Sequence, residues 1–358
     1  MTQPASHRVR RRHFRLWRKN KSFLYNLHPP RIPAAGARFT YTFGLGGLAV
    51  LTAFLTLVTG LLLMFYYVPT VERAHTSLAF IESVVAGGSF IRALHYWAAQ
   101  AMVAVVMLHL ARIVFTGGYR SPRDFNWLVG LGLLVVTLLW DFTGYTLRWD
   151  AGSLWALLVG TNLLKVAPGV GAQLYRLVVG DVILGENALL RFYTWHVFGL
   201  TLLGTGGIGY HIWRIRVDGG ISHPLPTPGR PRSFIPRETL FYRELLAALL
   251  ASSALILLSA VAPPPLLPAA DLSVAGNAEV KAPWFFLAIQ ELLRHLPPLW
   301  AGWIVPLSGL GLLAALPFID RRGPGRGEWF ARSRWKPQAM FGGLAVLIIA
   351  LTVIAALR

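Results

Sequence analysis

The sequence predicts an all-α integral membrane protein with about seven transmembrane helices, arranged as a group of four followed by a group of three. Two observations lead to this fold class. The 358 residues are 55% hydrophobic and only 14% charged, a balance that water-soluble domains do not show. Seven apolar stretches also reach the ~20 residues that a bilayer-spanning helix needs.

The first four apolar stretches form one group and the last three form another. They cover residues 40–67, 88–115, 127–147, 190–215, 240–262, 300–319 and 338–357. A segment rich in Pro, Gly and Arg separates the groups, and we interpret it as a surface linker. The predicted divisions are a basic N-terminal tail (1–38), a four-helix domain (39–216), the linker (217–239) and a three-helix domain (240–358).

The Lys and Arg residues predict how the chain crosses the membrane. After seven crossings one side would carry ten of them up to Arg38, three between the second and third stretches, six from Arg214 to Arg243 and six from Arg321 to Lys336, which is 25 of the 34. By the positive-inside rule we expect this side, and the N-terminus, to face the cytoplasm at the cell membrane. Because the basic residues lie between apolar runs, the formal net charge of +19 does not indicate nucleic-acid binding.

The connections on the opposite side are long. Residues 151–180 and 263–298 contain apolar residues interrupted by Gly and Pro, a pattern typical of short helices that lie at the membrane surface around a binding site. We therefore expect a substrate at this outer face. The chain has no cysteine, which excludes disulfides and thiolate metal sites, so any metal must be held by histidine or carboxylate.

Four of the ten histidines lie inside apolar stretches, where an imidazole is costly to bury without a partner. His95 and His109 are 14 residues apart in the second stretch, and His196 and His211 are 15 apart in the fourth. Both intervals are close to four helical turns, so each pair shares a helix face at a separation of about 21 Å. Because the two stretches run in the same direction, His95 can meet His196 near the outer surface, and His109 can meet His211 near the inner one.

Two imidazoles at each of two depths fit the axial ligands of two haem irons. A closed zinc site normally needs four ligands, which neither level supplies. Hydrogen bonds to neighbouring helices are the simpler alternative, but they do not explain the matched spacing. We therefore predict that His95 and His196 bind an outer haem b and that His109 and His211 bind an inner haem b, both non-covalently.

Glycine recurs at the same interval on the other two helices of the four. Gly46 and Gly60 lie 14 residues apart in the first stretch, as do Gly130 and Gly144 in the third. A flat macrocycle needs room between helices, and glycine provides it, although single glycines are common in membrane helices. Arg92, one turn before His95, is placed either to neutralise a propionate of the outer haem or to anchor the helix end.

Several short motifs, taken together, resemble cytochrome b of the bc and b6f complexes over about residues 22–320. They are Leu45-Gly46-Gly47 with Thr59-Gly60, Arg92-Ala93-Leu94-His95, Gly117-Gly118-Tyr119 with Pro122-Arg123, Phe142-Thr143-Gly144-Tyr145 with Trp149-Asp150, Arg191-Phe192-Tyr193, and Gly220-Ile221-Ser222. The 15-residue histidine interval and the seven stretches are more similar to cytochrome b6 joined to its subunit IV than to the mitochondrial protein.

The resemblance implies a subunit of a quinol oxidoreductase whose acceptor is a cytochrome c or a plastocyanin-type protein. In the Q cycle of this family, quinol is oxidised at an outer site, one electron leaves to a Rieske iron–sulfur protein, and the other crosses through two haems to reduce quinone near the inner face. The matching residues are Tyr145, Trp284 and Phe285 at the outer site, and Arg216 and Asp218 at the inner site. A homodimer with a c-type cytochrome subunit is also implied.

The chain departs from the family pattern at two places. Where the family has Pro-Glu-Trp-Tyr, it reads Ala282-Pro283-Trp284-Phe285, so the carboxylate expected to accept a quinol proton is missing. Glu291 is the replacement we predict, with Glu279 and His295 as alternatives, and each is also consistent with an interfacial surface residue. Gly44 occupies the position of the cysteine that tethers an extra inner haem in cytochrome b6, so no thioether forms here.

Two other functions remain open from the sequence alone. A haem-bearing membrane anchor of a dehydrogenase or hydrogenase that reduces quinone would not need the Trp284 segment or the last three stretches. A transporter with structural histidines would contain no haem and would leave the paired glycines unexplained.

Overall fold

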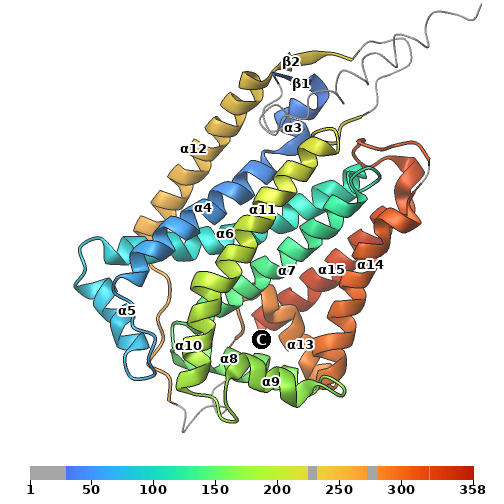
Figure 1. Ribbon diagram of the computed structural model, residues 1–358. Helices are drawn as coiled ribbons and strands as arrows, with labels where there is room; N and C mark the ends of the chain where they lie inside the picture. The colour runs from blue at the N-terminus through green and yellow to red at the C-terminus, as the bar shows by residue number, and fades with distance from the viewer. Residues whose placement is uncertain (1–29, 225–231, 272–280, 322) are drawn as a thin grey trace, which may run out of the picture.

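The computed structural model describes residues 30–224, 232–271, 281–321 and 323–358. The described chain is mostly helical, with one antiparallel pair of short strands (Figure 1). Most of the predicted N-terminal tail, the centre of the predicted linker and Glu279 lie outside the described residues.

The elements follow the predicted division into two groups. The first group comprises β1 (Arg31–Pro33), η1 (Ala34–Ala37), α3 (Phe39–Thr42), α4 (Leu45–Met64), α5 (Ala74–Ser83), α6 (Gly88–Thr116), α7 (Asp124–Thr146), α8 (Ala151–Lys165), α9 (Gly171–Val179), α10 (Glu186–Thr194), η2 (Trp195–Gly199) and α11 (Leu200–Val217). The second comprises β2 (Phe234–Pro236), α12 (Arg237–Val261), η3 (Trp284–Phe286), α13 (Leu287–His295), η4 (Trp300–Ile304), α14 (Val305–Ile319), η5 (Arg332–Arg334) and α15 (Trp335–Leu357).

Six spans among the described residues are long and apolar enough to cross a membrane: α4, α6, α7, α12, α14 together with η4, and α15 together with η5. They correspond to every predicted stretch except the fourth. That stretch, 190–215, lies in α10, η2 and α11, which follow one another without a break from Glu186 to Val217. It differs from the six because the π-helical turn η2 divides it and because α11 contains four glycines and two arginines. The chain is a multi-pass membrane protein.

The long helices form one bundle (Figure 1). Helix α4 packs on α6, α7 packs on α11, and α6 also contacts α7. Helix α12 contacts α4 and α6, whereas α14 contacts α7 and α15 contacts α6. The short helices α5, α8, α9, α10 and α13 gather at one end of the bundle, which we call the outer end, and the β1–β2 pair lies at the other, which we call the inner end (Figure 1).

Glycine and a capping box set the limits of two helices. Helix α6 begins after Gly87 and ends at Gly117, whose φ angles of 73° and 63° lie in the left-handed region that favours glycine. Helix α8 begins with a capping box, in which Asp150 Oδ1 accepts from the Ser153 amide at 2.8 Å and Ser153 Oγ accepts from the Asp150 amide at 2.9 Å. These caps place the connections around the bundle at fixed positions.

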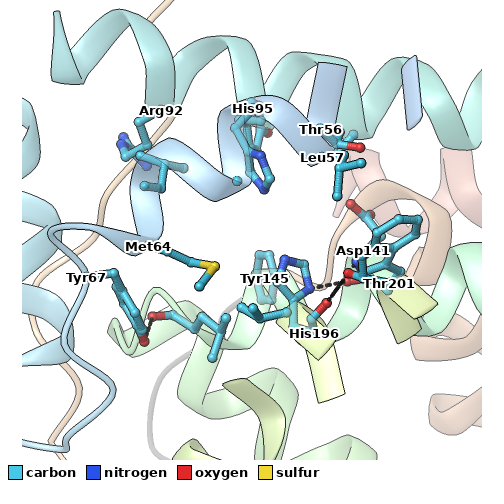
Figure 2. Close-up of a pocket in the computed structure, with 18 of the residues that line it drawn as sticks. Thr56, Leu57, Met64, Tyr67, Arg92, His95, Asp141, Tyr145, His196 and Thr201 are labelled. Carbon is cyan, nitrogen blue, oxygen red and sulfur yellow. Dashed lines mark hydrogen bonds between the residues drawn. The ribbon is translucent and has the colours of Figure 1, made fainter. Parts of the chain in front are cut away.

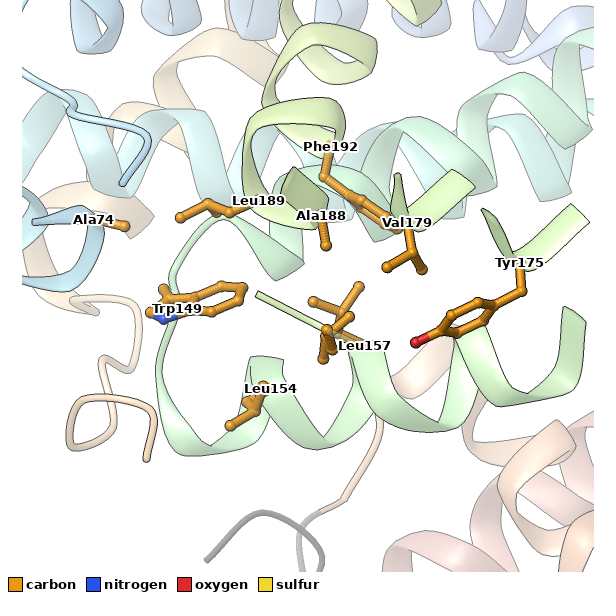
Figure 3. Close-up of a cluster of buried hydrophobic side chains, with 10 residues drawn as sticks. Ala74, Trp149, Leu154, Leu157, Tyr175, Val179, Ala188, Leu189 and Phe192 are labelled. Atoms are coloured by element: carbon orange, nitrogen blue, oxygen red, sulfur yellow. The ribbon is translucent and has the colours of Figure 1, made fainter. Parts of the chain in front are cut away.

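A cluster of buried apolar side chains joins the short helices of the outer end. Trp149 and Leu157 from the α8 region pack with Tyr175 and Val179 from α9 and with Leu189 from α10 (Figure 3). Each such side chain contributes about 1.5–3 kcal/mol when it is removed from water. Because α10 leads directly into η2, this cluster fixes the start of the helix that carries His196.

Candidate functional site

His95 and His196 face each other between α6 and η2, near the outer end of the bundle (Figure 2). Their ring centroids are 6.3 Å apart and the ring planes are inclined at 73°. An imidazole nitrogen binds a transition metal at about 2 Å and lies about 1 Å from its ring centre, so two imidazoles on opposite sides of one metal have centroids about 6 Å apart. The pair therefore fits the two axial positions of one haem iron.

Hydrogen bonds orient both imidazoles of this pair. Thr59 Oγ1 lies 3.0 Å from His95 Nδ1, and Thr143 Oγ1 lies 3.2 Å from His196 Nδ1. His196 Nδ1 also lies 3.0 Å from the carbonyl oxygen of Trp140, which can only accept. Nδ1 of His196 therefore carries the proton, and Nε2 keeps the lone pair that a metal needs.

The π-helical turn η2 explains why the histidine interval on the fourth stretch is 15 residues and not 14. In η2 the amide of Leu200 bonds to the carbonyl of Trp195, five residues earlier. A π turn inserts one extra residue into an α-helix. Fifteen residues with this turn therefore cover the same rotation as 14 residues of α6. The carbonyl of His196 accepts from Thr201 Oγ1 at 2.8 Å and from Trp140 Nε1 at 3.1 Å.

Each predicted glycine lies against one predicted histidine. A Cβ atom added to the glycine would stand 3.1 Å from His95 Cε1 at Gly60, 2.6 Å from His196 Cε1 at Gly144, 3.6 Å from His109 Cε1 at Gly46, and 3.3 Å from His211 Cε1 at Gly130. We expected the glycines to make room for a macrocycle. The structure shows that they make room for the imidazole rings, which lets the helices approach closely.

A cavity surrounds the outer histidine pair (Figure 2). It contains about 1240 Å³ of space free of atoms, including the part open to the surroundings, and its walls come from α4, α6, α7, α10, η2 and α11. Most lining side chains are apolar, as in cofactor sites generally. Within the described chain no three His, Asp or Glu side chains gather as a closed metal site would require. The two-ligand geometry thus favours a haem over a zinc ion.

His109 and His211 form the second pair, one helical repeat further toward the inner end. The two imidazoles are close enough to interact electrostatically. The carbonyl of Asn126, four residues before Gly130, faces His211 outside hydrogen-bond geometry, so His211 Nδ1 has no hydrogen-bond partner among the described residues.

Two arginines lie close to the histidine pairs. Arg92, which lines the outer cavity, forms an ion pair with Glu82 and donates from Nη2 to the Pro264 carbonyl at 2.6 Å. Its predicted contact with a haem propionate stays a prediction. Arg112, one turn after His109, is 5% exposed, and its Nε and Nη2 have no hydrogen-bond partner among the described residues. The sequence analysis did not single out Arg112.

The residues predicted for the outer quinol site border the same cavity. Tyr145 lines it, with the guanidinium of Arg148 4.2 Å from the centre of the Tyr145 ring. Trp284 Nε1 donates to Oε1 of Gln100, another lining residue, at 2.7 Å. Phe285 contacts Trp284 with ring centroids 5.6 Å apart. The three predicted residues are thus brought to one region.

Glu291, the predicted proton acceptor, does not line this cavity. Its side chain is 1% exposed and lies 2.9 Å from His295 Nε2, 3.0 Å from Arg358 Nη1 and 3.8 Å from Arg294 Nε. The hydrogen bond from His295 lowers the pKa of Glu291, and the two arginines add to this effect. The role of Glu291 as a proton acceptor stays a prediction, which this environment does not favour.

The inner predicted residues lie at the end of α11. Asp218 pairs with Arg214 Nη2 at 2.8 Å, and burial raises the pKa of Asp218 while Arg214 and Arg123 oppose the rise. Arg216 is half-buried, and its Nε has no hydrogen-bond partner among the described residues. Their predicted role in binding quinone stays a prediction.

These observations define a multi-pass membrane protein with imidazoles facing one another at two depths, as in a carrier of electrons across the membrane. Residues 33–218 match the family described as Cytochrome b/b6/petB. Cytochrome b6 of Heliobacterium mobile is 41% identical over 181 residues, which is 51% of this chain and 84% of that protein. Cytochrome b6 of Pyropia yezoensis is 39% identical with the same coverage.

The chain belongs to the cytochrome b/b6 family, the haem b proteins of membrane electron transport. Its fold is also similar to that of a chain in the structure titled "Hyperthermophilic respiratory Complex III", with a TM-score of 0.77, 24% identity, and coverage of 88% of this chain and 84% of that one. The family and the fold class predicted from the sequence are confirmed.

Proposed function

We propose that the chain is the di-haem cytochrome b subunit of a quinol oxidoreductase that passes electrons to a c-type cytochrome or a plastocyanin-type acceptor. The observation that carries this proposal is the facing pair His95 and His196, with ring centroids 6.3 Å apart and both Nδ1 atoms hydrogen-bonded. The glycine–histidine contacts repeat one level further in at His109 and His211, which supports a second cofactor.

The chain's own residues would hold and orient the two cofactors. His95 and His196 bind the outer haem b, and His109 and His211 bind the inner one. Bound haem b supplies an iron that takes up and passes on one electron. Arg92 toward the outer haem and Arg112 toward the inner one offer guanidinium groups for propionates. The apolar walls of the cavity exclude water from the outer cofactor.

The outer quinol site is proposed at the opening formed by Tyr145, Trp284 and Phe285. The hydrogen bond from Trp284 to Gln100 joins the C-terminal domain to the wall of the outer cavity, and a simple haem anchor would not need this contact. The inner quinone site is proposed near Arg216 and Asp218, at the inner end of α11.

The proposed setting is the cell membrane, with the N-terminus in the cytoplasm as the charge distribution predicts. The proposed partners are a Rieske iron–sulfur protein and a c-type cytochrome. A homodimer is proposed by family resemblance.

Quinol-dependent haem reduction tests this proposal. The native membrane complex would be mixed rapidly with decylubiquinol while haem absorbance is followed, for the natural chain, Trp284→Ala and the control Trp335→Ala at an exposed inner position. We expect reduction by quinol that Trp284→Ala slows at least about tenfold, since a central aromatic contact is worth about 2 kcal/mol or more, and that Trp335→Ala leaves unchanged. Haem that is reduced by a soluble iron–sulfur donor and not by quinol would replace this proposal with the anchor function.

A further inference from the structure

Asp141 is a buried carboxyl group in the outer cavity. It lies in α7, one helical turn before Gly144, and is 8% exposed. Its side chain belongs to the wall of the cavity that also contains His95 and His196 (Figure 2). Its Oδ2 atom has no hydrogen-bond partner among the described residues.

The cations of the cavity pair with other carboxylates. Arg92 forms an ion pair with Glu82, and Arg148 forms one with Asp150 at 3.2 Å. Among the residues that line the cavity, Asp141 is the only carboxyl group. The other titratable groups facing the cavity are Tyr67 after α4, Arg92, His95 and Tyr96 of α6, Tyr145 and Arg148 of the α7 region, Tyr193 of α10, and His196 of η2.

A carboxyl group in such a place responds strongly to nearby charge. A buried carboxylate without a partner is costly, and carboxyl groups inside membrane helices mark proton pathways. An electron that enters the cavity adds one negative charge in a medium that screens it poorly. That added charge favours the protonated form of Asp141 over the ionised form.

We propose that Asp141 is a redox-linked proton acceptor of the outer cavity, which rests on the proposed function. Its carboxylate takes up one proton when the outer haem gains one electron, and it releases that proton when the electron leaves. During turnover the quinol supplies both the electron and the proton; in an equilibrium titration water supplies the proton. The Ala282–Phe285 segment has no carboxylate, and Asp141 provides one from the opposite domain.

Redox titrations of the purified holoprotein between pH 5.5 and 9 test this inference. The midpoint potentials of both haems would be measured in the natural chain, in Asp141→Asn, in Asp141→Glu and in the surface control Asp181→Asn at the same end of the molecule. In the natural chain we expect the outer potential to fall as pH rises, because the ionised carboxylate stabilises the oxidised cofactor. Asp141→Asn should match the natural chain at acidic pH and lie above it at alkaline pH, while its inner potential is unchanged.

The Asp141→Glu variant should restore the pH dependence, and Asp181→Asn should keep it. A reduced-minus-oxidised infrared spectrum should show a protonated carboxyl band that is absent in Asp141→Asn and shifted in Asp141→Glu; this band makes the assignment if the Asn variant binds no haem. An outer potential with the same pH dependence in Asp141→Asn overturns the inference and leaves the two-haem proposal intact. Absence of two haems from the natural chain overturns the proposed function itself.

Discussion

The outer and inner histidine pairs share one scaffold and differ in the polar groups around it. In the outer pair a threonine precedes each glycine, and Thr59 and Thr143 each place a hydroxyl at hydrogen-bond distance from a histidine Nδ1. In the inner pair the residues before the glycines are Leu45 and Val129, which have no hydroxyl. The 14-residue repeat therefore fixes where the imidazoles stand, while the residue beside each glycine determines what they bond to.

This difference predicts two electronically unequal sites. Partners of the second ring nitrogen fix the orientation of a metal-bound histidine and raise its basicity. A more basic ligand stabilises the oxidised iron, so we expect the outer haem to have the lower midpoint potential. The predictions below test this comparison by removing one site, closing one site, and then altering its hydrogen bonds.

Loss of one histidine should have the largest effect. His196→Leu should lower the haem content from two per chain to one and remove the outer signal, because a single imidazole cannot hold both axial positions. His211→Leu should remove the inner signal and keep the outer one. Haem quantification with optical redox titration measures both. Retention of two haems in either variant would contradict the assignment.

Closing the outer site with one methyl group should have the next largest effect. In Gly144→Ala the new Cβ would lie 2.6 Å from His196 Cε1, whereas at Gly132 on the same helix nothing lies within 4 Å. Overpacking costs about 1–3 kcal/mol, roughly a tenfold loss of outer haem affinity. Gly132→Ala should bind both haems normally, and Gly46→Ala, with 3.6 Å to His109, should have an intermediate effect. Equal haem affinity in Gly144→Ala and Gly132→Ala would show that the glycine contact is not required.

Removal of one hydroxyl should change the potential of the outer haem without removing it. Thr143→Val keeps the shape of the side chain and deletes the contact to His196 Nδ1, while the Trp140 carbonyl remains. We expect the outer midpoint potential to rise, the inner one to stay constant, and outer haem affinity to fall by roughly tenfold. A shift confined to the inner haem would reverse the comparison.

The Glu291 cluster should have the smallest effect. Because His295 lowers the pKa of Glu291, the carboxylate stabilises the folded chain above its ordinary pKa of about 4.5, and this stability is lost as pH falls through the lowered value. Glu291→Gln should lower the Tm slightly at pH 7, and the difference should vanish near pH 4. Thermal unfolding in detergent across this pH range measures it. A difference that grows toward acidic pH would contradict the account.

The helix pattern and the four histidines could be predicted from sequence because apolar length and matched spacing are one-dimensional signals. The role of the glycines required the structure, since only packing shows that Gly60 and Gly144 lie against imidazoles and not against open space. The π turn at His196 leaves no periodic signal, although the 15-residue interval was its trace. Asp141 was missed because a single carboxyl in an apolar stretch has no partner in the sequence to mark it. The Thr-Gly pairs at 59–60 and 143–144 were a signal that the spacing argument had not used.

The most direct test of the two-level account is a pyridine haemochrome assay on the purified chain, followed by a redox titration of its visible spectrum. The account predicts two haems b per chain with separate midpoint potentials, the lower one belonging to the His95–His196 pair. One haem per chain, or none, would contradict the four-histidine assignment.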